Sequence, residues 1–115
     1  MPIYKIYQQK LIELNSCDFG DLILHVVKIF EKNPDIRNIY SQNFKYILVD
    51  EYQDTNFIQS KWLKLLTTKN NNICCVGDDD QSIYSWRGAE IKNFLEFDKI
   101  YNNTKIVRLE RNYRS

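Results

Sequence analysis

An apolar run that ends in two adjacent carboxylates constrains this sequence more than any other feature. Tyr46–Val49 is typical of a buried β-strand, and Asp50 and Glu51 follow it directly. Two carboxylates ~4 Å apart repel each other by roughly 4 kcal/mol at an effective dielectric constant near 20. A divalent metal ion held together with a phosphate substrate would offset that repulsion. A second interpretation, in which the pair serves a helix N-terminus or a salt bridge, accounts for the residues equally well.

The rest of the C-terminal part alternates between helices and strands. A second apolar strand is predicted at 73–76 and a third at 105–109, with helices at about 56–67 and 90–99. This alternation is typical of parallel βαβ units, so the predicted fold class is α/β. In such sheets ligands collect at the carboxyl ends of the strands. We therefore expect three polar pairs to converge on one edge: Asp50–Glu51, Gly77–Asp78 and Glu110–Arg111.

The N-terminal part is predicted to be helical. Residues 3–11 have helical spacing, and a second helix begins at an N-cap, Asp18, with Asp21 three positions later. Its apolar stripe is Phe19, Leu22, Ile23, Val26, Val27 and Phe30. A short helix at 35–42 is expected to turn Ile36, Ile39 and Tyr40 inward, and Asp54 is expected to cap the helix at 56–67. We divide the chain into a helical segment, 1–43, and the sheet-bearing part, 44–115.

Length and composition exclude several classes of protein. A chain of 115 residues makes one domain at most, and its formal net charge of +1 predicts no general affinity for polyanions. Contact with nucleic acid would need a local patch or stacking. The three cysteines and His25 make neither a disulfide framework nor a zinc site, and buried free thiols are expected. Because no apolar run approaches ~20 residues, we expect a cytoplasmic chain without a membrane partner.

A second polar cluster follows the strand at 73–76. Three consecutive aspartates, Asp78–Asp80, suit either a metal site or a solvated turn, and Gln81 could hydrogen-bond a phosphate or a water molecule. Tyr84 and Trp86 are two positions apart, so both rings face the same way in an extended segment, with Arg87 beside them. Such a group can be a platform for unstacked bases, or the two rings can belong to the core.

The third cluster ends the chain, at 108–115. Arg111 and Arg114 could neutralise phosphate charge, and Tyr113 could stack on a base. A solvated basic terminus is the other interpretation.

In this order, the three clusters resemble the UvrD/Rep/PcrA group of superfamily 1 DNA helicases. Val49–Asn56 is similar to motif II of that family, Val76–Ala89 to motif III, and Leu109–Ser115 to the start of motif IV. Asp18–Leu22 is similar to the helix start that precedes motif II. The resemblance covers nearly the whole chain.

The resemblance implies a set of site residues and two cofactors, ATP and Mg²⁺. Asp50 matches the magnesium-binding aspartate, Glu51 the glutamate that activates water, and Gln81 the glutamine that senses the γ-phosphate. Tyr84 and Trp86 match family aromatics that stack on single-stranded DNA, and Arg87 lies in the same element. Tyr113 matches the family tyrosine that stacks on adenine, and Arg114 matches an arginine that contacts the γ-phosphate.

The resemblance also implies a partial RecA-like, P-loop NTPase motor domain from an ATP-dependent 3′–5′ DNA helicase of repair or replication. Its partners would be single-stranded DNA, single/double-strand junctions and the rest of the helicase chain. A P-loop needs Gly-x-x-x-x-Gly-Lys-Ser/Thr, and none of the three glycines, Gly20, Gly77 and Gly88, fits it. We therefore expect a fragment, a split gene or a decayed copy that is inactive alone. The alternatives are a non-catalytic single-stranded-DNA-binding module and the helicase part of a helicase–nuclease.

Overall fold

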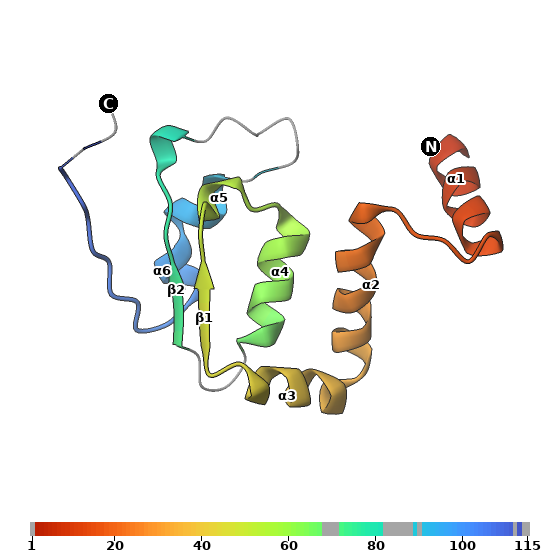
Figure 1. Ribbon diagram of the computed structural model, residues 1–115, viewed down its shortest axis with the longest axis horizontal. Coiled ribbons are helices and arrows are strands. Elements are labelled where there is room, and N and C mark those ends of the chain that lie inside the picture. Colours follow the sequence, from red (N-terminus) through yellow and green to blue (C-terminus); the bar gives the residue numbers. More distant parts are fainter. Residues whose placement is uncertain (1, 68–71, 82–88, 90, 112, 114–115) are drawn as a thin grey trace.

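The computed structural model describes residues 2–67, 72–81, 89, 91–111 and 113, and its first three elements are helices (Figure 1). They are α1 (Pro2–Glu13), α2 (Phe19–Lys32) and α3 (Pro34–Asn43). The predicted cap of α2 is confirmed: the Asp21 amide donates to the Asp18 carboxylate at 2.8 Å, and the Asp18 amide donates to Asp21 at 3.3 Å. None of the described helices is long and apolar enough to cross a bilayer.

Two parallel strands form the described sheet. β1 (Tyr46–Val49) pairs with β2 (Asn72–Cys75), so that Val49 lies opposite Cys75. The connection runs through a 3₁₀ turn, η1 (Tyr52–Asp54), and α4 (Phe57–Leu66). The predicted α/β class and both of these strands are confirmed, because the continuous apolar runs set a local strand preference that pairing completes.

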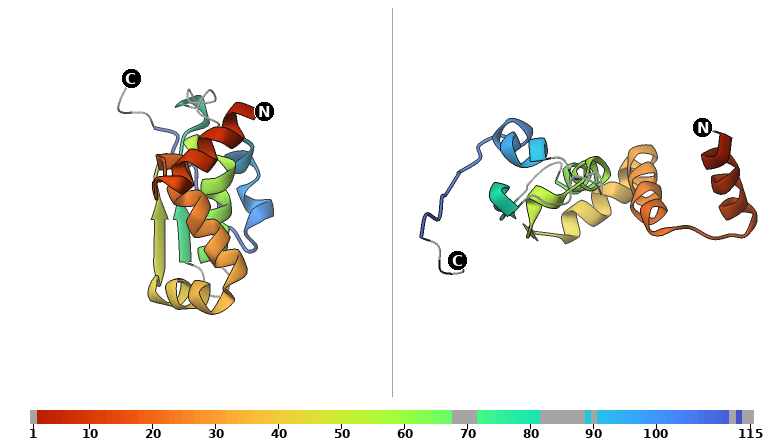
Figure 2. Two further views of the ribbon diagram at one scale, coloured as in Figure 1. Left: turned by 90° about the vertical axis from the view of Figure 1, so that its right-hand side faces the viewer. Right: turned by 90° about the horizontal axis from the view of Figure 1, so that it is seen from above.

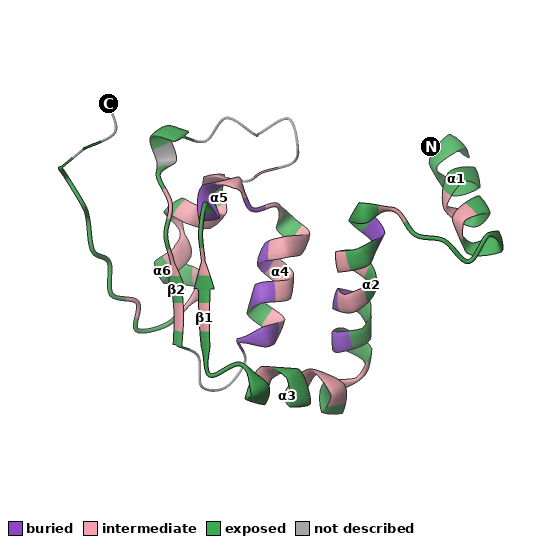
Figure 3. Cartoon of the chain, in the orientation of Figure 1, coloured by how far each residue is buried: buried purple, intermediate pink, exposed green. Residues whose placement is uncertain are grey.

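The core lies between α2, α4 and the sheet, and Figures 1 and 3 show α4 standing between α2 and β1. Its buried apolar residues are Val27, Phe30, Tyr52, Leu63 and Leu66. An ion pair from Lys61 to Glu31, at 2.6 Å, also joins α4 to α2. The spacing of its apolar residues predicts α4 where it forms, and predicts that it buries Phe57, Ile58, Trp62, Leu65 and Leu66. Phe57 is instead 58% exposed.

One face of the sheet is open, which corrects the prediction that β1 is a buried strand. Tyr46 and Leu48 are 73% and 80% exposed, whereas Ile47 and Val49 are half-buried. Figure 2 shows α4, α5 and α6 on one side of the strands. An apolar run therefore predicted the strand but not what covers it, because coverage depends on other elements.

Three helix details are also corrected. The first turn of α2 is exposed at Phe19 and Leu22, and α3 leaves Ile39 and Tyr40 largely exposed. Asp54 does not cap α4. Asn56 does so, since its side chain accepts from the Gln59 amide at 2.9 Å and Gln59 bonds back to the Asn56 amide.

The C-terminal part differs most from prediction. The expected single helix at 90–99 is two short helices, α5 (Ile91–Leu95) and α6 (Phe97–Ile100), interrupted at Glu96. The expected strand at 105–109 is extended but belongs to no described sheet, and it runs outside β2 in Figure 1. Val107 is 70% and Leu109 90% exposed. A strand forms only where a neighbour accepts and donates its backbone hydrogen bonds, and among the described residues this segment has none.

Aromatic contacts hold α6 against the turn after β1. The rings of Tyr52 and Phe97 meet edge to face at 5.4 Å, and Phe97 packs on Tyr101 at 4.6 Å. Burial raises the pKa of Tyr101 to about 12, and it also raises the pKa of the Tyr52 phenol, against a smaller opposing effect of the nearby Ser60. The position of η1 is therefore fixed by the packing of Phe97 in α6 against Tyr52, as well as by the end of β1.

Cysteine reactivity should report which strand face is covered. Cys17 and Cys74 are exposed, contrary to the expectation of buried thiols, and Cys75 lies on the covered face, where burial raises its pKa to about 12. Since the thiolate is the reactive form, alkylation of Cys75 at pH 8 is expected to be at least about tenfold slower than that of Cys74. Mass spectrometry of iodoacetamide-treated chain would measure this, with urea-unfolded chain as control. Equal rates in the folded chain would contradict the assigned strand faces.

Candidate active site

The carboxyl ends of β1 and β2 meet at one edge of the sheet, at the upper end of the strands in Figure 1. Pairing continues past the strands, because the Val76 amide donates to Val49 at 2.8 Å and the Tyr52 amide donates to Val76 at 3.0 Å. These bonds bring the residues after β1 beside those after β2. Two of the three polar pairs expected to converge, Asp50–Glu51 and Gly77–Asp78, therefore lie together.

Asp50 and Glu51 leave β1 through a left-handed turn. Glu51 has φ 49° and ψ 42°, a conformation that costs a non-glycine residue on the order of 1–3 kcal/mol and that persists where the surroundings enforce it. Both side chains are exposed, and an Asp50 carboxylate oxygen accepts from the Glu51 amide at 2.9 Å. The strained turn gives the two carboxylates different partners.

The two other interpretations of this acidic pair find no support among the described residues. No Lys or Arg of the described ranges lies within ion-pair distance of Asp50 or Glu51. The next α-helix is capped by Asn56. The part of the chain that the structure describes also has no group of three His, Cys, Asp or Glu side chains that could hold a metal by themselves. Mg²⁺ commonly takes only one or two protein carboxylates together with phosphate oxygens, and an exposed Asp50 fits that use.

Gln53 is a site residue that the sequence reasoning missed. Its side chain is fully buried, at 0% exposure, in η1. Its Nε2 donates to a Glu51 carboxylate oxygen, and its Oε1 accepts from the Asp78 amide at 3.1 Å. The sequence did contain one signal for this role: Gln53 lies two residues after Glu51. Its side-chain amide has both a donor and an acceptor, so it can bond a carboxylate and a backbone N–H at once.

Gln81 lies in a second 3₁₀ turn, η2 (Asp79–Gln81), which follows β2 after three further residues, 76–78. Its Nε2 donates to an Asp78 carboxylate oxygen at 2.7 Å, and the other oxygen of Asp78 accepts from the Asp80 amide at 3.0 Å. Asp78 thus organises the turn, and both oxygens of this first member of the aspartate run contact its own loop. Gln81 itself is exposed at the same edge as Asp50 and Glu51.

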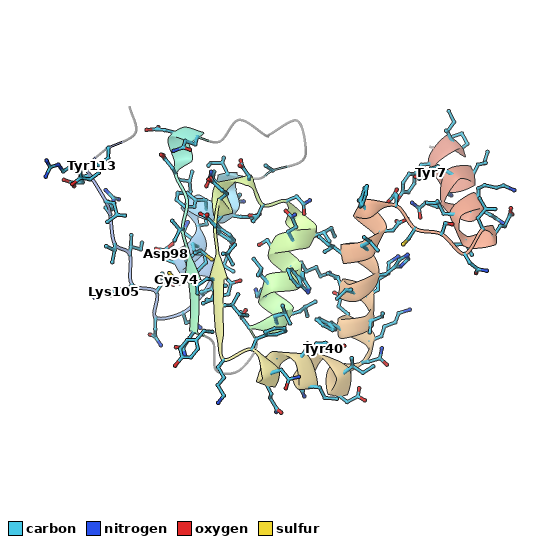
Figure 4. The ribbon with its side chains drawn as sticks, in the orientation of Figure 1. Tyr7, Tyr40, Cys74, Asp98, Lys105 and Tyr113 are labelled. Carbon is cyan, nitrogen blue, oxygen red and sulfur yellow. The ribbon has the colours of Figure 1, made fainter. Side chains whose placement is uncertain are left out.

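Of the remaining predicted site residues the structure describes only Tyr113, and it does not lie at this edge. Tyr113 is 83% exposed on the extended C-terminal segment, away from β1 in Figure 4, with the Arg111 guanidinium 5.1 Å from its ring centroid. Four predicted residues lie outside the described ranges: Tyr84, Trp86, Arg87 and Arg114. The described site therefore consists of Asp50, Glu51, Gln53, Asp78 and Gln81.

The family model and the relatives that match this chain agree with one another. Residues 1–102 match the family model described as UvrD/REP helicase N-terminal domain. The chain is 52% identical over 113 residues to a "Probable DNA helicase II homolog" of Rickettsia felis and 53% identical to "DNA helicase II" of Rickettsia typhi. It is 50% identical to the "ATP-dependent DNA helicase PcrA" of Bacillus subtilis. Each match covers 98% of this chain but only 15 to 17% of the relative.

Proposed function

Because this chain belongs to the UvrD/REP helicase family, we propose that it supplies part of the ATP-hydrolysing centre of a DNA helicase. The observation that carries the proposal is the meeting of Asp50, Glu51 and Gln81 at the carboxyl edge of two parallel strands. Parallel α/β sheets bind ligands at that edge. The finer proposal is a RecA-like motor that moves 3′ to 5′ along single-stranded DNA and opens single/double-strand junctions in repair or replication.

The described residues would divide the chemistry among them. Asp50 would hold Mg²⁺, which supplies charge neutralisation to the phosphates when bound. Glu51 would orient the attacking water and accept its proton. Gln81 would report the presence of the γ-phosphate through its exposed amide.

The other parts of the site are assigned from the family resemblance alone. Tyr113 would stack on adenine and Arg114 would contact the γ-phosphate, while Tyr84, Trp86 and Arg87 would hold single-stranded DNA. The printed sequence has no Gly-x-x-x-x-Gly-Lys segment, so the phosphate cradle would come from the rest of a helicase chain.

A chimaeric helicase tests this proposal. In it, this chain replaces the matching region of Bacillus subtilis PcrA, to which it is 50% identical. We expect single-stranded DNA to stimulate ATP hydrolysis by the chimaera, and a duplex with a 3′ tail to be unwound in preference to one with a 5′ tail. Fluorescence unwinding and coupled ATPase assays measure both.

A chimaera that folds, binds ATP and still shows no DNA-stimulated turnover would contradict the proposal. Trp86→Ala in the chimaera tests DNA binding separately from nucleotide binding. Stacking is worth about 1–3 kcal/mol per base, so this variant should bind oligo(dT) about 5- to 150-fold more weakly and retain nucleotide binding.

A further inference from the structure

We infer that Gln53 is a positioning residue that orients Glu51 and ties it to the loop that carries Gln81, an inference that rests on the proposed function for its catalytic meaning. The connection, which we call the Gln53 relay, runs through four residues. Glu51 accepts from Gln53 Nε2, Gln53 Oε1 accepts from the Asp78 amide, and an Asp78 carboxylate oxygen accepts from Gln81 Nε2. It spans the ends of both strands.

The orientation of the Gln53 amide is determined by its two partners. A carboxylate can only accept a hydrogen bond and a backbone N–H can only donate one, so only one of the two amide flips satisfies both. The group is fully buried, and a buried amide without partners is costly. Gln53 is therefore held at both ends, and it transmits that order to the exposed Glu51 carboxylate.

The surrounding structure leaves a space for this amide. A Cβ on Gly77 would come within 2.6 Å of Gln53 Oε1 and 2.8 Å of the Phe94 ring in α5. Only a residue without a side chain at position 77 leaves room for Gln53 Oε1 and the Phe94 ring at these positions. The close approach at Gly77 is a second observation, independent of the hydrogen bonds, that supports a fixed position for the Gln53 side chain.

The relay matters because Glu51 needs help to keep one orientation. Its backbone is in a left-handed conformation and its side chain is exposed, so without a partner the carboxylate would sample several rotamers. Displacement of a catalytic group by about 1 Å can cost about 100-fold in rate. At the other end, the same amide fixes the Asp78 backbone, and Asp78 holds Gln81.

The first test uses the 115-residue chain and needs no activity. Gln53→Glu keeps the size of the side chain but places a second carboxylate against Glu51. The new carboxylate can still accept from the Asp78 amide, but its repulsion from Glu51 is expected to displace it. Hydrogen exchange at the Asp78 amide should therefore become about tenfold faster. In the double variant Glu51→Gln/Gln53→Glu the donor and acceptor are exchanged, and protection of the Asp78 amide should return to within about twofold of the original.

The two outcomes that overturn the relay are clear. If Gln53 only filled space, the similarly sized but apolar Gln53→Met variant would exchange like the original chain. If the swapped pair failed to restore protection, the Glu51–Gln53 contact would not be what holds the loop. Thermal unfolding of the same variants shows whether any of them fails to fold, and Gln53→Met, which loses both contacts, sets the upper limit of the effect.

The second test measures turnover in the chimaera. Gln53→Glu is expected to lower kcat for ATP about 10- to 100-fold while KM for ATP changes less than about threefold, because orientation and not nucleotide binding is lost. The matched control is Thr67→Val, which removes another buried hydrogen bond, from Thr67 Oγ1 to the Leu63 carbonyl at 2.8 Å, far from this edge. It should leave kcat within about twofold. An inactive parent chimaera would count against the proposed function, whereas the exchange experiment would still decide the relay.

Discussion

Replacing Glu51 with glutamine is expected to reduce DNA-stimulated ATP turnover by the chimaera about 10²- to 10⁴-fold, the range typical of losing a positioned general base. Glutamine has the same shape but cannot take a proton from water. Its Oε1 can still accept from Gln53 Nε2, so the relay and the left-handed turn should survive. Nucleotide affinity, measured with a fluorescent ATP analogue, is therefore expected to stay within about threefold.

The control for this variant is the same substitution at another glutamate. Glu31 is partly exposed on α2 and pairs with Lys61 at 2.6 Å, away from the sheet edge. Surface pairs of this kind contribute about 0–1 kcal/mol, so Glu31→Gln should not alter turnover. If Glu51→Gln hydrolysed ATP as fast as Glu31→Gln, Glu51 would not be the base.

Replacing Gly77 with alanine is expected to lower the free energy of unfolding of the 115-residue chain by about 1–3 kcal/mol, the usual cost of overpacking. The added methyl would lie 2.6 Å from Gln53 Oε1 and 2.8 Å from Phe94. Gln53 is fully buried and bonded at both ends, so it cannot move away without breaking the relay. Urea unfolding followed by circular dichroism measures the loss.

Gly20→Ala provides the matched control. Gly20 lies in the first turn of α2, and a Cβ there would meet only Asp18 Oδ1, at an ordinary 3.4 Å. Because alanine loses less backbone entropy in a helix, this variant should be stabilised by about 0.5–1 kcal/mol. Equal urea midpoints for the Gly77 variant and the original chain would mean that the space around Gln53 is not as tight as described.

The sequence predicted those elements whose signals are local. The Asp18–Asp21 cap and the apolar runs of β1 and β2 all act within a few residues, and each was found where predicted. Burial was predicted less well. Phe19 and Phe57 have helical spacing yet are exposed, because periodicity defines a face and not the element that covers it.

For the site, topology alone brought Asp50 and Asp78 to one edge, since parallel strands place their carboxyl ends together. The same argument failed at 105–109, because a strand also needs a neighbour and that segment has none among the described residues. The sequence by itself thus determined the capped start of α2, two strands, their shared edge and the resemblance to a family. Only the tertiary structure decided which faces are covered, where the last segment runs and how Gln53 reaches both strand ends. These depend on contacts between residues far apart in the chain, such as Gln53 with Asp78 and Phe94 with Gly77, which no local pattern records.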